Sequence, residues 1–113
     1  MKLLIIFDKD IQISPEKICV HVGHCARSIT SSIFYNEDFD TYSEWRANEF
    51  KTVLLRDKIT NIVIKKIKEV GVHSYKIYDA GLDGVFTPGT ILGYAVLVHN
   101  SDDTFKRLRT LKF

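Results

Sequence analysis

A loop between two apolar runs carries the side chains best suited to chemistry. Residues 75–78 and 91–98 read as strands, whereas residues 79–90 between them are polar and contain several glycines. Asp79 falls at the end of the first strand and Thr90 at the start of the second, which brings a carboxylate and a hydroxyl close together. Because loops held by buried strands often display reactive groups, we expect a functional site here.

A second set of polar side chains follows one face of a predicted helix. Ser14 and Pro15 are typical of a helix start, since serine caps the free N–H groups and proline suits the first helical position. The helix then carries two stripes at helical spacing, one apolar and one polar, displaced by one residue. The apolar stripe consists of Ile18, Val22, Cys25 and Ile29. The polar stripe, which we expect to border a cleft at the edge of the sheet, consists of Lys17, His21, His24 and Ser28.

The spacing of two histidines and a cysteine on this helix also fits a metal site. His21, His24 and Cys25 lie at positions i, i+3 and i+4, and Asp79 or Asp83 could complete the ligand set. Cys25, however, belongs to the apolar stripe, so we predict neither a metal site nor a cofactor. The sequence also lacks a phosphate-binding Gly-x-x-x-x-Gly-Lys loop and a serine nucleophile elbow, which argues against an NTPase and against a Ser-His-Asp hydrolase.

Two separate motifs resemble those of one family, the type 2 peptidyl-tRNA hydrolases. Residues 79–90 resemble the family signature Asp-Ala-Gly-x-Thr-Gln…Gly-Thr. Residues 17–26 resemble its first-helix pattern Gly-Lys-x-Ala-Ala-Gln-x-x-His-Ala. The resemblance extends over nearly the whole chain, through a Trp-bearing helix at residues 42–45 and a strand at residues 51–56. Since the two motifs occur in the right order and at the right separation, the resemblance is fairly specific.

The resemblance implies cleavage of the ester that joins a peptide to the 3′ ribose of tRNA, without a metal. Four residues match the motifs and are the expected catalytic ones: Lys17, His24, Asp79 and Thr90. In this interpretation Asp79 orients or activates water, Lys17 stabilises negative charge, Thr90 bonds to the substrate and His24 shuttles a proton. If Lys17 pairs with Asp79, the carboxylate should stay ionised near neutral pH. The expected substrate-binding residues are His21, Asp83, Thr87, Lys106 and Arg107.

The chain departs from the family pattern at several positions of the site. Asp83-Gly84 replaces Thr-Gln after the Asp-Ala-Gly motif, and His21 replaces the glutamine of the first helix. His99-Asn100 stands where the family has Gly-Pro. An alternative to the hydrolase is therefore a catalytically degenerate protein of the same fold, binding an RNA end, a nucleotide or a protein partner. A third interpretation is self-association of the sheet edge into a homodimer.

The composition indicates one domain, residues 1–113, with a single core. The chain is 45% hydrophobic and 27% charged, and no apolar run could span a bilayer, so we predict a cytoplasmic protein without membrane contact. Two cysteines at unpaired helical positions fit a reducing compartment. The formal net charge is only +2, but lysines and arginines gather in residues 51–76 and 106–112. They form either a polyanion-binding side or a solvated helix face.

Strands alternate with helices along the chain, which predicts an α/β/α sandwich with a mixed sheet of about four strands and helices on both faces. Four apolar runs read as strands: residues 3–7, 52–55, 72–78 and 92–98. Besides the helix that starts at Ser14, we predict helices at residues 41–48, at residues 59–70 with Asp57 as the cap and Gly71 as the stop, and at residues 102–108. Residues 36–40 are predicted to be a loop.

Overall fold

The computed structural model describes residues 1–82 and 84–112 and has an α/β fold, as the sequence predicts. In the described residues it comprises four strands and three helices. Their order along the chain is β1 (Lys2–Asp8), α1 (Pro15–Tyr35), α2 (Phe39–Ala47), β2 (Thr52–Asp57), α3 (Asn61–Val70), β3 (His73–Asp79) and β4 (Thr90–Val98). No helix in these residues combines the length and the apolarity that crossing a bilayer requires.

The four strands form one mixed sheet in the order β2-β1-β4-β3. Strand β1 is parallel to β2 and antiparallel to β4, and β4 is antiparallel to β3. It follows that β1, β2 and β3 all run in one direction, so their carboxyl ends lie at the same edge of the sheet. Helix α1 begins shortly after β1 has left this edge.

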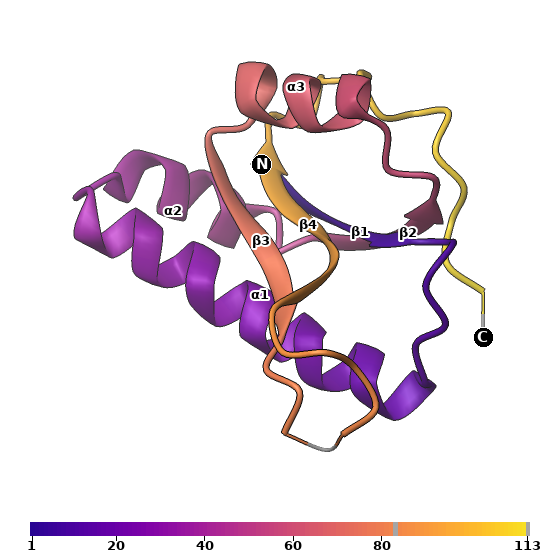
Figure 1. The fold of residues 1–113 in the computed structure, drawn as a ribbon. Coiled ribbons are helices and arrows are strands. Elements are labelled where there is room, and N and C mark those ends of the chain that lie inside the picture. Colours follow the sequence, from indigo (N-terminus) through magenta and orange to yellow (C-terminus); the bar gives the residue numbers. More distant parts are fainter. Residues whose placement is uncertain (83, 113) are drawn as a thin grey trace.

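Helices cover both faces of the sheet (Figure 1), which confirms the predicted three layers. Helices α1 and α2 lie on one face and α3 on the other. Alternate residues of β1 point to opposite faces, since Leu3, Ile5 and Phe7 join the core under α1 whereas Leu4 and Ile6 join the core under α3. Burial on both faces explains why β1 reads as a continuous apolar run.

The local signals at the start of α1 are confirmed. Ser14 is the N-cap, and its hydroxyl oxygen accepts a hydrogen bond from the backbone N–H of Lys17 at 3.2 Å, with Pro15 at the first helical position. Ile18, Cys25 and Ile29 are buried against the sheet. The cap and the apolar stripe together fix which side chains of the first turn face the end of β3.

The predicted cap of α3 is wrong. Thr60, not Asp57, is the N-cap, and its hydroxyl oxygen accepts from the backbone N–H of Val63. The carboxylate of Asp57 instead accepts from the backbone N–H groups of Lys58 and Arg109. These bonds tie the end of β2 to the C-terminal segment. Gly71 follows the helix as its C-cap, as predicted.

The predicted helix at residues 102–108 is also wrong, because this segment forms a series of turns. Phe105 anchors it in the core under α3, and Leu55 and Thr110 form an isolated antiparallel bridge beside β2. The predicted loop at residues 36–40 is shorter than expected, since α2 already begins at Phe39.

Candidate active site

Lys17 and Asp79 form an ion pair between the start of α1 and the end of β3. The Nζ atom of Lys17 lies 2.5 Å from Oδ2 of Asp79. Alternation along β3 turns Asp79 to the same face as the buried Ile77, toward α1. The side chains are only 18% and 5% exposed, respectively, so the pair is largely withdrawn from water.

Asp79 is held as an anion by donors on two sides. Oδ2 accepts from Lys17, and Oδ1 accepts from the backbone N–H of Gly81 at 2.7 Å. Gly81 has a φ of +72°, a left-handed conformation that glycine adopts without strain. The hydrogen bond from Lys17 lowers the pKa of Asp79 most, the Gly81 N–H lowers it further, and burial opposes both. The carboxylate is therefore ionised at neutral pH.

His21 is the second group that faces the carboxylate of Asp79. Its Nε2 atom lies 3.6 Å from Asp79 Oδ2, and its side chain is 7% exposed. Burial lowers the pKa of His21, His24 and Lys17 lower it further, and Asp79 partly opposes these effects. The imidazole is therefore neutral at pH 7. Among the described residues, its Nδ1 atom is buried and has no hydrogen-bond partner.

His24 lies beside His21, one helical turn further along α1. The two rings meet edge to face, with centroids 5.5 Å apart. His24 is half-buried and lines the same cleft. The sequence predicted that His21 binds substrate, and the structure puts it against Asp79. The sequence predicted that His24 is catalytic, and the structure puts it further along the cleft.

Thr90 stands opposite Asp79 across the β3–β4 pair, as the sequence suggests. Its hydroxyl, however, donates to the backbone oxygen of Thr87 at 2.6 Å, and its N–H donates to the same oxygen at 3.1 Å. The Thr90 hydroxyl therefore holds the loop in this structure. The side chain of Thr87 is exposed at the turn.

A cleft of about 470 Å³ opens over these groups, and much of its wall is apolar. The Phe86 ring lies over the ammonium group of Lys17, with 4.9 Å between Nζ and the ring centroid. Other apolar wall residues are Val20, Leu82 and Val85, which are 54%, 95% and 67% exposed. We did not predict this wall from the sequence. Exposed apolar side chains inside an otherwise polar loop are the signal that could have indicated it.

The remaining predicted site residues lie elsewhere. Lys106 and Arg107 are exposed in the C-terminal turns next to Phe105, which packs on the α3 face of the sheet, and Lys106 pairs with Asp103. Asp79 and α1 lie on the opposite face, so the structure does not bring these two cations to the cleft. Asp83, predicted to bind substrate, lies outside the described residues.

In residues 1–82 and 84–112 no group of three or more histidine, cysteine, aspartate or glutamate side chains could hold a metal ion. Cys25, weighed above as a ligand, is fully buried in the core, and burial raises the pKa of its thiol to about 12. A thiol with so high a pKa is protonated at neutral pH, whereas a metal ligand must be a thiolate.

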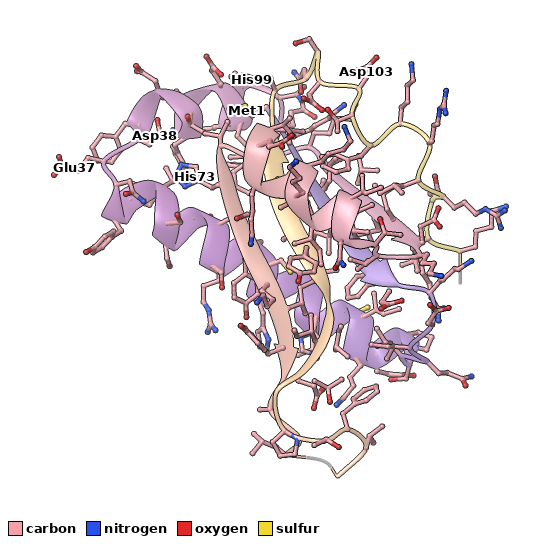
Figure 2. All side chains as sticks on the ribbon, turned by 45° about the horizontal axis from the view of Figure 1, so that its top comes forward. Met1, Glu37, Asp38, His73, His99 and Asp103 are labelled. Carbon is pink, nitrogen blue, oxygen red and sulfur yellow. The ribbon has the colours of Figure 1, made fainter. Side chains whose placement is uncertain are left out.

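A separate hydrogen-bonded group lies at the far end of α1, where His73 faces Asp38 (Figure 2). The ring nitrogens of His73 lie 2.8 Å from Ser32 Oγ and 2.9 Å from Asp38 Oδ2. The three residue types match a Ser-His-Asp hydrolase, but Ser32 belongs to the last turns of α1. A helix C-terminus presents carbonyl oxygens, which repel an oxyanion. This group instead fastens the α1–α2 corner to β3.

Comparison with known protein families identifies the family of this chain. The sequence model of the family described as Peptidyl-tRNA hydrolase PTH2 matches residues 1–111 of this chain. No curated protein matches it.

Proposed function

The chain belongs to the peptidyl-tRNA hydrolase PTH2 family, and on this premise we propose that it cleaves the ester between a peptide and the 3′ ribose of tRNA. The observation that carries the proposal is the buried Lys17–Asp79 ion pair with the neutral His21 beside it. The three groups come from the two segments that match the family motifs, and they share one cleft with an apolar wall.

Lys17 is the proposed electrostatic stabiliser of the reaction. Ester hydrolysis builds negative charge on the carbonyl oxygen as water attacks, and a fixed cation nearby lowers the energy of that state. The Nζ atom of Lys17 is partly shielded from water, where its charge acts more strongly than in bulk solvent. Asp79 and the ring of Phe86 hold the ammonium group in position.

Asp79 is proposed to position its neighbours and the attacking water. A carboxylate whose pKa is lowered is a weak base at neutral pH, so it is poorly suited to take a proton from water. It is well suited to hold the ammonium group of Lys17 and to face the Nε2 side of His21. The Gly81 N–H keeps the carboxylate in that orientation.

His21 is the proposed general base. With a proton on Nε2, turned toward Asp79, the neutral ring carries its lone pair on Nδ1, which no described residue uses. Since this atom is buried, proton transfer from water requires the ring to turn toward the cleft. Burial favours this neutral form. His21 stands where the motif of the family has glutamine, which cannot act as a base, so this chain would use a proton acceptor of its own. His24 stays a predicted proton shuttle, and Thr90 stays a predicted substrate contact.

The proposed reaction requires tRNA, so we propose tRNA as the partner of this protein. We propose the cytoplasm as its location. Hydrolysis of purified N-acetyl-aminoacyl-tRNA in EDTA tests the proposal. We expect turnover by the parent chain and at least a ~100-fold lower kcat for Lys17→Ala. Lys68→Ala removes an exposed lysine of α3 and is the matched control, expected to match the parent. If the folded parent does not hydrolyse this substrate, the result would instead support the alternative of a catalytically degenerate binding protein.

A further inference from the structure

We propose that a row of unpaired cations along the carboxyl edge of the sheet binds the phosphates of the 3′ end of tRNA, an inference that rests on the proposed function. We call this row the basic groove and define it by Lys9, Arg56, Arg109 and Lys112. It leads away from the candidate active site toward the C-terminal segment.

The groove follows from the topology of the sheet. Because β1, β2 and β3 are parallel, their last residues Asp8, Asp57 and Asp79 lie at one edge. The active site occupies the β3 end of this edge. The β2 end lies three strand spacings away, or roughly 14 Å. That length accommodates the phosphates of a few nucleotides.

Shared residues connect the active-site cleft with two further hollows on this edge. Gln12 lines both the active-site cleft and the adjoining hollow of about 460 Å³. Lys9, Arg56 and Lys112 line both that hollow and the next one, to which Arg109 also contributes. A chain seated at the ester could therefore continue past Gln12 into the first hollow and past Lys9, Arg56 and Lys112 into the second.

The cations of the groove are available for a ligand. Within the described part of the chain, none of the four forms an ion pair, and Asp10 is the one acid among the described residues lining the two hollows. Lys9, Arg109 and Lys112 are exposed. Arg56 is anchored, because one of its terminal nitrogens donates to the backbone oxygen of Ile11 at 2.9 Å.

Two of these cations are also held in place by the backbone of the fold. The N–H of Arg56 donates to the backbone oxygen of Arg109, and the N–H of Arg109 donates to the carboxylate of Asp57. The Nε atom of Arg56 is buried and has no hydrogen-bond partner among the described residues. Because this nitrogen is out of contact with solvent, Arg56 offers a bound phosphate the charge of its guanidinium group, which lines both hollows.

Two exposed cations elsewhere on the molecule are engaged by acids. Lys65 of α3 pairs with Glu69, and Lys106 pairs with Asp103. The cations on the carboxyl edge combine a concave setting with a position next to the ester site. A linear series of such charges suits a polynucleotide backbone, whose binding releases counterions and weakens as salt rises.

Binding of uncharged tRNA at several salt concentrations tests the groove without depending on hydrolysis. The groove variant carries Lys9→Gln and Lys112→Gln, and the matched control carries Lys66→Gln and Lys68→Gln on the exposed face of α3. Loss of two phosphate contacts should raise Kd roughly 10- to 30-fold at 0.15 M salt and lower the salt slope by about 1.5 to 2. The control should match the parent.

A second arm identifies the part of the RNA that the groove contacts. With tRNA trimmed of its unpaired 3′ end, the parent and the groove variant should bind with similar Kd. Any of three results would overturn the proposal. The groove variant could lose as much affinity for trimmed tRNA as for intact tRNA, the groove and control variants could bind with equal Kd, or the parent could fail to bind. Tight, groove-dependent binding by a parent without turnover would uphold the groove and overturn the hydrolase.

Discussion

The ammonium group of Lys17 and the carboxylate of Asp79 lie in direct contact, although 62 positions separate them in the sequence. The contact exists because α1 begins and β3 ends at the same edge of the sheet (Figure 1). Each group needs the other, since removal of either partner leaves a largely buried charge without compensation. The pair therefore links the stability of the fold to the chemistry of the cleft.

Asp79 should stabilise the protein at neutral pH and cease to do so in acid. Its pKa in the folded state lies below the unfolded value, so its contribution is present above about pH 4 and is lost as the pH falls through the lowered pKa. Asp79→Asn should reduce the free energy of unfolding by about 1–3 kcal/mol at pH 6. Urea midpoints of parent and variant should converge as the pH falls below the lowered pKa of Asp79. A difference that stays constant with pH would contradict this.

His21 should set the acid limb of the pH–rate profile. Its pKa is lowered, so the neutral base persists below pH 6.5 and activity should fall only at more acid pH. His21→Gln should lower kcat by about 100-fold and remove this limb. Measuring kcat from pH 4.5 to 8 for His21→Gln and His24→Gln checks the assignment. Loss of the limb in His24→Gln alone would assign proton transfer to His24.

Gly81 should be more sensitive to substitution than Gly84, although both have positive φ angles, +72° and +74°. A Cβ at Gly81 would meet Pro88 at 2.8 Å and the Phe86 oxygen at 2.9 Å, whereas a Cβ at Gly84 meets nothing within 4 Å. Gly81→Ala should displace the N–H that orients Asp79 and lower kcat about 10- to 100-fold. Gly84→Ala introduces a similar backbone strain, but its kcat should fall much less than that of Gly81→Ala. Equal losses would show that only the strain matters.

One of the two cysteines should react in the folded protein. Cys19 is exposed, whereas Cys25 is buried and has a thiol pKa of about 12. Titration with a chromogenic disulfide at pH 8 should give one fast thiol per native chain and two in urea. Cys19→Ser should abolish the fast phase. Two fast thiols in the native parent would contradict the packing of α1 on the sheet.

The sequence was sufficient to predict the layered fold, because its signals are local. The continuous apolar run of β1 and the serine–proline start of α1 each specify an element without help from distant residues. The cap of α3 was predicted wrongly because Asp57 is engaged by Arg109, which lies 52 positions away. The last predicted helix failed for a similar reason, since residues around Thr110 pair with Leu55 of β2.

The site could be predicted in part. Lys17 and Asp79 were assigned to one site, with their pairing left as a condition, and the structure brings the two side chains into contact. His21 and His24 follow the same stripe of α1, and which of them faces Asp79 depends on the rotation of the helix against β3, which spacing does not encode. The apolar wall at Phe86 depends on the path of the loop back over Lys17, which the turn residues alone do not specify.

The most direct test is the single-turnover rate of N-acetyl-aminoacyl-tRNA hydrolysis by the parent and by Asp79→Asn, measured in EDTA at neutral pH. The substitution keeps the size of the side chain and removes its charge. Circular dichroism of the same samples verifies that the variant is folded. We predict ready turnover by the parent and a loss of about 100- to 1,000-fold in the variant. A folded variant that hydrolyses the ester as fast as the parent would contradict the assignment of this cleft as the active site.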